Sequence, residues 1–289
     1  MAKKTRDKNQ HHSMVGEVWH QFKKNRNAVI GLIVLCIFII IAVFAPVIAP
    51  YGYDDQDATH TKIAPCREYP FGTDNLGRDV LSRIIHGSRY SLMIGFLAVT
   101  ISIIAGGILG VLAAFYPKLD NIIMRTMDLF MAIPQMLLAM CIVAALGSSL
   151  FNLMLAVGLS STPQFARVVR ASVLSTRGQE YVEAARAIGG SDFNVIVRHI
   201  IPNSLAPLIV QATLSMARAI ISASALSFLG FGIQAPKPEW GAMLSAGRKY
   251  IRQCWWLTVI PGLAIMVVVY ALNVVGDGLR DSLDPSLKK

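Results

Sequence analysis

Residues 181–202 read YVEAARAIGGSDFNVIVRHIIP, a polar segment in a chain that is otherwise mostly apolar. Small or apolar residues in its first part recur at i, i+3, i+4 and i+7, the spacing of one helical face; they are Tyr181, Ala184, Ala185 and Ile188. Gly189 and Gly190 predict the end of this helix, because glycine readily takes the left-handed conformation that follows a helix. The segment is too short and too polar to span a membrane.

The second part of the segment predicts another short helix. Ser191 can cap its N-terminus, and Asp192 lies close to the positive end of the helix dipole. Its apolar residues again form a helical stripe, namely Phe193, Ile196, Val197 and Ile200. The whole loop, 172–205, is longer than a connection needs. We interpret it as a docking site for a cytoplasmic partner; the alternative is a surface hairpin without a partner.

The sequence on both sides of this segment is apolar. The chain has 289 residues, of which 54% are hydrophobic and 15% are charged, whereas soluble domains carry about 25% charged residues. A helix crosses the hydrocarbon core with about 20 apolar residues. We therefore expect an all-α polytopic membrane protein. Its six expected spans are about 28–49, 89–116, 122–146, 152–170, 206–232 and 255–276.

Basic residues predict the orientation of these spans. Six spans place both termini on one side, and that side carries 17 Lys and Arg residues against 9 on the other. Basic residues gather in the cytoplasm, so both termini are expected there. The same rule accounts for the net charge of +10 without nucleic acid. The expected divisions are a basic tail, a first span with an extracytoplasmic loop, a core of five spans and a C-terminal tail, at 1–27, 28–88, 89–276 and 277–289.

The basic tail contains an amphipathic stretch. Over 15–26, apolar residues lie at helical spacing beside lysine and arginine, which predicts a helix lying on the cytoplasmic membrane surface.

Motifs for catalysis and nucleotide binding are missing. The sequence has no GxxxxGK[ST] phosphate loop and no Gly-Lys dipeptide, and it lacks HExxH, CxxC and GxSxG. We therefore expect no catalytic residue and no metal ligand. Cys66 and Cys254 both fall on the expected outer side, where a disulfide is chemically possible; the alternative is two unrelated thiols.

The segment quoted first resembles the EAA loop of ABC importer permeases. Glu183-Ala184-Ala185 is followed after three residues by Gly189, and nine residues later by His199–Pro202. The family pattern ends in Ile-x-Leu-Pro. Here histidine replaces the first Ile, as in the peptide-transporter branch, and Ile201 replaces Leu.

Further blocks are similar to the second, C-type, permease subunit of the dipeptide/oligopeptide/nickel branch. They occur in the family's order and spacing, and read FGTDNLGRD at 71–79, SFLG at 227–230, PEWG at 238–241 and GDGLRD at 276–281, with Asp284-Pro285 after them. The resemblance implies a type I ABC importer fold in the bacterial cytoplasmic (inner) membrane.

The resemblance also implies partners. Two homologous permease chains would form the pore, two ABC ATPase subunits would bind ATP and Mg²⁺, and an extracytoplasmic binding protein would deliver substrate. This chain would then be no enzyme and hold no cofactor. The residues implied in ATPase coupling are Tyr181, Glu183, Ala184, Ala185, Arg186, Ile188 and Gly189.

The substrate implied is short peptides, with nickel chelates or glutathione as alternatives in the same family. A proton-coupled secondary carrier is the rival from a different class. Such a carrier would need acidic residues within spans, and among the expected spans only Asp128 is acidic.

Isolated charges are further candidate site residues. Arg218 falls near the middle of the fifth expected span, where a charge is costly and either lines the pore or pairs inside the bundle. Asp128, in the third, could pair with Arg218 or with Arg125. On the outer side the candidates for contact with the binding protein or the sister permease are Asp74, Arg78, Asp79, Glu239 and Trp240.

Small residues and prolines predict how the spans pack. Gly106, Gly107 and Gly110 give the second span a small face that favours close helix packing. Pro134, Pro163 and Pro261 predict breaks in the third, fourth and sixth spans.

Overall fold

The computed structural model describes residues 14–283, so residues 1–13 of the expected tail 1–27 and Asp284-Pro285 lie outside the described residues. Helices form most of the described chain, and no strand occurs between residues 14 and 283. The all-α prediction is confirmed. In chain order the elements are α1 (Met14–Lys24), α2 (Arg26–Val43), α3 (Ala45–Ile48), η1 (Ala58–His60), α4 (Val80–Phe115), α5 (Pro117–Ala132), α6 (Gln135–Leu146), α7 (Leu150–Arg177), α8 (Glu180–Ala187), α9 (Asp192–Val195), η2 (Ile196–Ile200), α10 (Ile201–Phe228), α11 (Trp240–Gly247), η3 (Arg248–Tyr250) and α12 (Trp256–Leu283).

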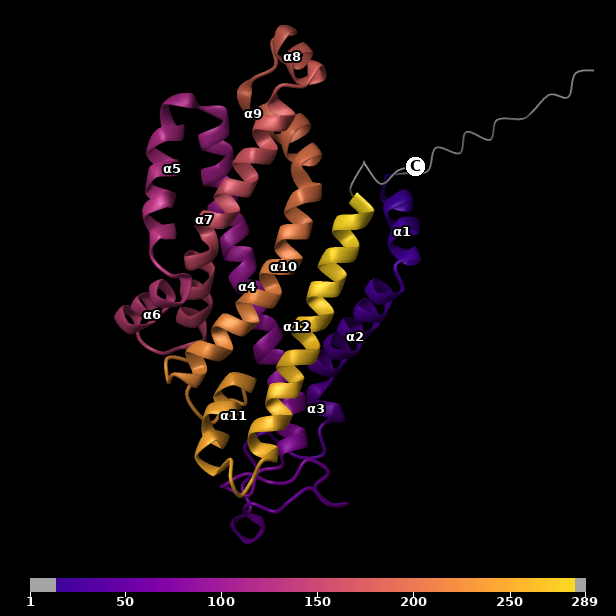
Figure 1. Ribbon diagram of the computed structural model, residues 1–289, viewed down its shortest axis with the longest axis vertical. Helices are drawn as coiled ribbons and strands as arrows, with labels where there is room; N and C mark the ends of the chain where they lie inside the picture. The colour runs from indigo at the N-terminus through magenta and orange to yellow at the C-terminus, as the bar shows by residue number, and fades with distance from the viewer. Residues whose placement is uncertain (1–13, 284–289) are drawn as a thin grey trace, which may run out of the picture.

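The long helices run along the long axis of the molecule (Figure 1). The upper end in this view carries α1, α8 and the last turns of α12, and the lower end carries α11 and the loops that precede α4. In the described chain, four helical stretches are long and apolar enough to cross a membrane, and α5 with α6 makes a fifth if that bent pair counts as one span. The four stretches are Arg26–Val43, Val80–Phe115, Asp192–Phe228 and Trp256–Leu283.

The expected span 152–170 corresponds to α7, which is 28 residues long but is not apolar enough to count among those four. It contains Arg167 and Arg170 and several serines, and about half of its residues are buried against its neighbours. A helix enclosed by other helices needs fewer apolar side chains than one that faces lipid on most sides.

The expected span 122–146 is not one helix. α5 ends at Ala132, α6 begins at Gln135, and their axes differ by 92°. Pro134 causes the break, because proline pushes the preceding residue out of the helical conformation, and Ile133 is extended at φ −91°, ψ 128°. The side-chain amide of Gln135 donates to Ser161 Oγ of α7 at 2.7 Å, which fixes the turn.

The other two prolines behave differently from the prediction. Pro163 and Pro261 lie inside α7 and α12, which continue through them as single helices. Both prolines are buried, so packing on all sides holds these helices despite the hydrogen bond that each proline removes.

The predicted small face of the second span is confirmed for two of its glycines. A Cβ on Gly106 would lie 2.6 Å from Phe165 Cβ, and one on Gly110 would lie 2.6 Å from the carbonyl oxygen of Ala166, both in α7. Gly107 faces open space instead. The two backbones therefore approach closely along α4 and α7, as small residues allow within a membrane.

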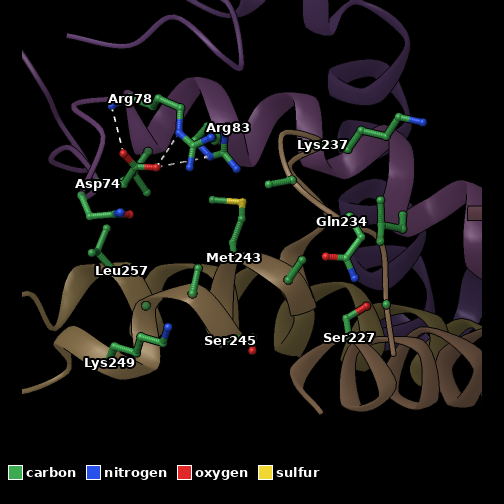
Figure 2. A pocket seen from close by; sticks show the side chains of 18 of the residues that line it. Asp74, Arg78, Arg83, Ser227, Gln234, Lys237, Met243, Ser245, Lys249 and Leu257 are labelled. Carbon is green, nitrogen blue, oxygen red and sulfur yellow. Dashed lines mark hydrogen bonds and ion pairs between the residues drawn. The ribbon is translucent and has the colours of Figure 1, made fainter. Parts of the chain in front are cut away.

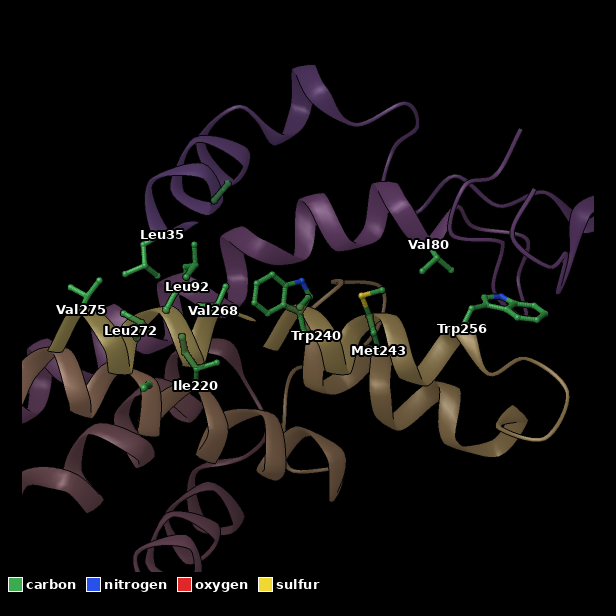
Figure 3. Packing of buried hydrophobic residues seen from close by; sticks show 14 of the residues in the cluster. Leu35, Val80, Leu92, Ile220, Trp240, Met243, Trp256, Val268, Leu272 and Val275 are labelled. Atoms are coloured by element: carbon green, nitrogen blue, oxygen red, sulfur yellow. The ribbon is translucent and has the colours of Figure 1, made fainter. Parts of the chain in front are cut away.

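A second packing centre joins α2, α4, α10, α11 and α12 (Figure 3). Trp240 at the start of α11 is fully buried there, edge-on to Phe38 with ring centroids 5.9 Å apart. Its indole N–H donates to the carbonyl oxygen of Ile84 in α4 at 3.1 Å. Trp240 thereby fastens the short helix α11 to two long helices, α2 and α4.

The amphipathic stretch 15–26 is helical as α1 up to Lys24, and Asn25 then caps α2. Within α1, Phe22 is buried and Trp19 is 48% exposed. Its position at a membrane surface stays a prediction. Cys66 is exposed and Cys254 is buried, and both thiols are free, so the alternative of two unrelated thiols holds.

Candidate functional site

The loop that contains the EAA motif stands at the upper end of the molecule as α8, a turn, α9 and η2 (Figure 1). Val182, Ala185, Val195 and Ile200 are buried and pack with residues at the ends of α4 and α7. Arg177 supports this junction, because its guanidinium donates to the carbonyl oxygens of Ala114 and Phe115 at 2.9 and 3.3 Å. These donations satisfy the last carbonyl groups of α4.

The predicted turn is confirmed in detail. Gly189 takes φ +86°, and the N–H of Gly190 donates to the carbonyl oxygen of Ala185 at 3.1 Å, the bond that closes a helix with a left-handed residue at its end. Ser191 Oγ accepts from the N–H of Asn194 at 3.4 Å and caps α9. The loop is thus a defined two-helix unit.

The expected stripe of the second helix is wrong in part. Phe193 and Val197 are 77% and 43% exposed, whereas Val195 and Ile200 are buried. The reason is that 196–200 is a π-helix, whose i→i+5 bonds place more residues in each turn than the α-helical spacing assumes.

The predicted coupling residues divide between two faces of α8. Tyr181, Glu183, Ala184, Ile188 and Gly189 are exposed, and Ile188 is exposed to 87%. Ala185 instead lies on the buried face with Val182. The side chain of Arg186 lies outside the described residues. The outward face is therefore small and apolar in part.

The isolated charges do not pair with each other. Asp128 accepts from Arg167 of α7 at 2.5 Å, and not from Arg218 or Arg125 as considered from the sequence. The physical reason is that α5 packs beside α7. A second ion pair that the sequence did not suggest, Arg170–Asp120, joins the same two helices through two hydrogen bonds of 2.5 Å.

Arg218 forms a polar cluster with neutral side chains. Its guanidinium donates to Gln164 Oε1 of α7 at 3.2 Å and to Ser215 Oγ at 3.0 Å. Gln211 also donates to Ser215 Oγ, at 3.3 Å. We call Gln164, Gln211, Ser215 and Arg218 the α10 polar cluster.

The candidate residues of the lower end line or adjoin a cavity of about 290 Å³ (Figure 2). Asp74 and Arg78 are buried and joined by a hydrogen bond of 2.8 Å from Nε to Oδ2. Arg83, in the first turn of α4, donates to the carbonyl oxygens of Tyr53 and Pro236 at 2.7 and 3.4 Å. It thereby ties the loop before α4 to the loop before α11.

Two further candidates of this end are helix caps. Asp79 accepts from the N–H of Ser82 at 2.8 Å and begins α4. Glu239 accepts from the N–H groups of Gly241 and Ala242, both at 2.8 Å, and begins α11. Burial raises the pKa of the Glu239 carboxyl, while these N–H donors oppose the rise. With Trp240, these buried side chains hold the loops of the lower end in place.

Comparison with known proteins identifies the family to which this chain belongs. Residues 103–289 match the family described as binding-protein-dependent transport system inner membrane component, and residues 13–65 match the N-terminal TM domain of oligopeptide transport permease C. The chain belongs to this family of transport permeases. The permease is 47% identical over 273 residues to the dipeptide transport system permease protein DppC of Alkalihalophilus pseudofirmus, covering 94% of this chain and 90% of the relative.

Other relatives and solved structures agree. The permease is 45% identical over 283 residues to the di/tripeptide transport system permease protein DppC of Pseudomonas aeruginosa, covering 96% of this chain and 93% of the relative. Its fold resembles an inward-facing MetNI methionine ABC transporter, with TM-score 0.58 and 19% identity over 69% of this chain and 96% of that chain. A second match is an amino acid ABC transporter, with TM-score 0.53 and 15% identity over 68% and 92%.

Family membership has direct consequences. The permease is a multi-pass protein of the bacterial inner membrane and a subunit of an ABC importer. It is not an enzyme, because ATP hydrolysis in these transporters belongs to partner ATPases.

Proposed function

We propose that this permease is one half of a two-chain pore that imports short peptides. The other half is a homologous permease, and an extracytoplasmic binding protein delivers the peptide. Support comes from relatives at 45–47% identity that are named for dipeptides and di/tripeptides and match over nearly the whole chain. Neither of these relatives is named for nickel chelates or glutathione.

The exposed face of the loop at the upper end supports the proposal that this chain works with ATPase subunits. Its outward face exposes Tyr181, Ala184 and Ile188, while Val182 and Ala185 fix it from beneath. An isoleucine that is 87% exposed on a polar loop favours coverage by a partner. We place the ATPase groove there, with ATP and Mg²⁺ bound by that partner. ATP then shifts the pore between two states because it binds one of them better.

We further propose six spans with both termini in the cytoplasm. Two of the crossings consist of two helices each, namely α2 with α3 and the bent pair of α5 with α6. The other four crossings are single helices: α4, α7, α10 and α12. At 28 residues α7 is about 42 Å long, which is enough to cross the hydrocarbon core. The upper end is then cytoplasmic, and the loops around the 290 Å³ cavity face outward toward the binding protein.

The experiment is a mild-detergent pull-down of the tagged chain, read by mass spectrometry and an ATPase assay. We expect recovery of a homologous permease and one or two P-loop ATPases.

Ile188→Ser removes an exposed apolar contact of about 1–2 kcal/mol, so roughly tenfold less ATPase should be recovered while the sister permease remains.

The matched control for this variant is Val47→Ser, which removes an aliphatic side chain of similar exposure, 83%, at the opposite end. It should leave ATPase recovery unchanged. Recovery of the chain alone without ATPase activity would contradict the proposal and favour a secondary carrier.

A further inference from the structure

Arg218 lies deep within the proposed membrane layer. It precedes Phe228, the outer end of α10, by about 15 Å at 1.5 Å per residue. The hydrocarbon core is about 30 Å thick, so this depth is close to its middle. The side chain of Arg218 is nonetheless exposed on the surface of the single chain.

The charge of Arg218 is not neutralised within the described chain. Its two hydrogen-bond acceptors, Gln164 Oε1 and Ser215 Oγ, are both neutral. None of the ion pairs found between residues 14 and 283 includes it, and Asp128 is engaged by Arg167. A guanidinium has five N–H donors, and the cluster uses two of them. The others are free for a ligand.

This face of α10 cannot be a lipid face, because an unpaired charge at this depth is costly in hydrocarbon. The α10 polar cluster also leads to a second cavity, of about 350 Å³, near the cytoplasmic ends of α10 and α12. Gln211 belongs to both the cluster and the cavity wall, and Arg280 lies on the same wall. The wall of this cavity is mostly apolar, and Gln211 and Arg280 are its two polar residues.

We propose that Arg218 binds the C-terminal carboxylate of the peptide during translocation, with Gln164 and Ser215 as positioning residues. This inference rests on the proposed import of peptides. Every peptide carries that carboxylate whatever its sequence, and the planar guanidinium fork matches a carboxylate through two parallel hydrogen bonds. Contact with one charged group holds the peptide weakly enough for release toward the cytoplasm.

The test uses the complete transporter in liposomes, with both permeases, the ATPases and the binding protein. ATP-driven uptake of trialanine is compared with uptake of its C-terminal amide, each divided by the measured occupancy of the binding protein. We expect the unmodified transporter to import the free acid about tenfold faster, the effect of one charge-assisted contact. Arg218→Gln should bring the ratio close to one, and Arg218→Lys should give an intermediate ratio.

The matched control is Lys118→Gln, which removes one exposed positive charge at the start of α5, outside the cluster. It should keep the ratio of the unmodified transporter. An Arg218→Gln transporter that imports both peptides with an unchanged ratio would overturn the carboxylate site alone. Absence of any peptide uptake by the unmodified transporter would instead overturn the proposed function.

A structural role for Arg218 is tested separately by pull-down. Full recovery of the sister permease with Arg218→Gln supports the carboxylate site. Loss of the sister permease with Arg218→Gln but not with Arg218→Lys would assign Arg218 to an ion pair between the two permeases and overturn the inference.

Discussion

Gly189 determines the geometry of the loop at the cytoplasmic end. Its φ of +86° lies in the left-handed region, and no other atom would come within 4 Å of a Cβ placed there. The constraint on this residue is therefore conformational and does not come from crowding. An L-residue other than glycine pays about 1–2 kcal/mol in this conformation, and asparagine tolerates it better than most.

We expect Gly189→Ala to lower ATPase activity that depends on loaded binding protein by about tenfold, because about 1–2 kcal/mol of backbone strain displaces α8 from its docking geometry. Gly189→Asn should lose less of this ATPase activity than Gly189→Ala. The measurement is ATPase activity of the reconstituted transporter with and without binding protein.

Gly178 supplies the control for Gly189. It has φ −82°, ordinary for any residue, and open space around a Cβ. Gly178→Ala should retain the full stimulation of ATPase activity by the loaded binding protein. Equal loss in the two alanine variants would show that the left-handed turn is not what matters.

The contact between α4 and α7 shows how one element is shaped by another. Gly106 sits against Phe165 and the backbone of Thr162, whereas its neighbour Gly107 faces open space. The two glycines look identical in sequence, and only the position of α7 separates them.

We expect Gly106→Ala to destabilise the bundle, because overpacking costs about 1–3 kcal/mol and outweighs the gain of about 1 kcal/mol in helix propensity. Gly107→Ala should be neutral or slightly stabilising. Thermal unfolding of the detergent-purified transporter measures both. A Tm for Gly106→Ala at or above that of Gly107→Ala would refute the close contact.

The bent pair α5 and α6 is a further case at this scale. Pro134 alone predicts an interruption, but the 92° change of direction needs the rest of the fold. Two ion pairs, Asp120–Arg170 and Asp128–Arg167, hold α5 beside α7. The exposed pair, Asp128–Arg167, contributes little to stability by itself. The half-buried pair, Asp120–Arg170, holds the two helices together more strongly.

At the scale of the whole molecule, the six-span arrangement predicts opposite accessibility for two loops. Cys66 is native and exposed in the outer loop, and Ala187 is exposed in α8. A membrane-impermeant maleimide should label the unmodified chain from outside through Cys66. Cys66→Ser should abolish this labelling.

In the Cys66→Ser background, Ala187→Cys should be labelled only after the membrane is opened. This background also controls for the other three native cysteines. Labelling of Ala187→Cys from outside would reverse the orientation and place the EAA loop away from any ATPase.

The sequence by itself determined the membrane class, the position of most helices and the EAA loop with its double glycine. These features depend on neighbours within a few residues: hydrophobic length, capping groups and the backbone freedom of Gly189. It also singled out Arg218, because a lone charge in an apolar run is visible without a fold.

Only the tertiary structure decided which residues meet. Asp128 pairs with Arg167, Ala185 faces inward, and Glu239 is a buried helix cap. These outcomes depend on the angle and depth at which helices far apart in sequence pack. In addition, the π-helix between α9 and α10 rotates side chains away from the face that regular α-helical spacing predicts. A local pattern specifies which residues share a helix face, but the neighbouring helices decide what that face touches.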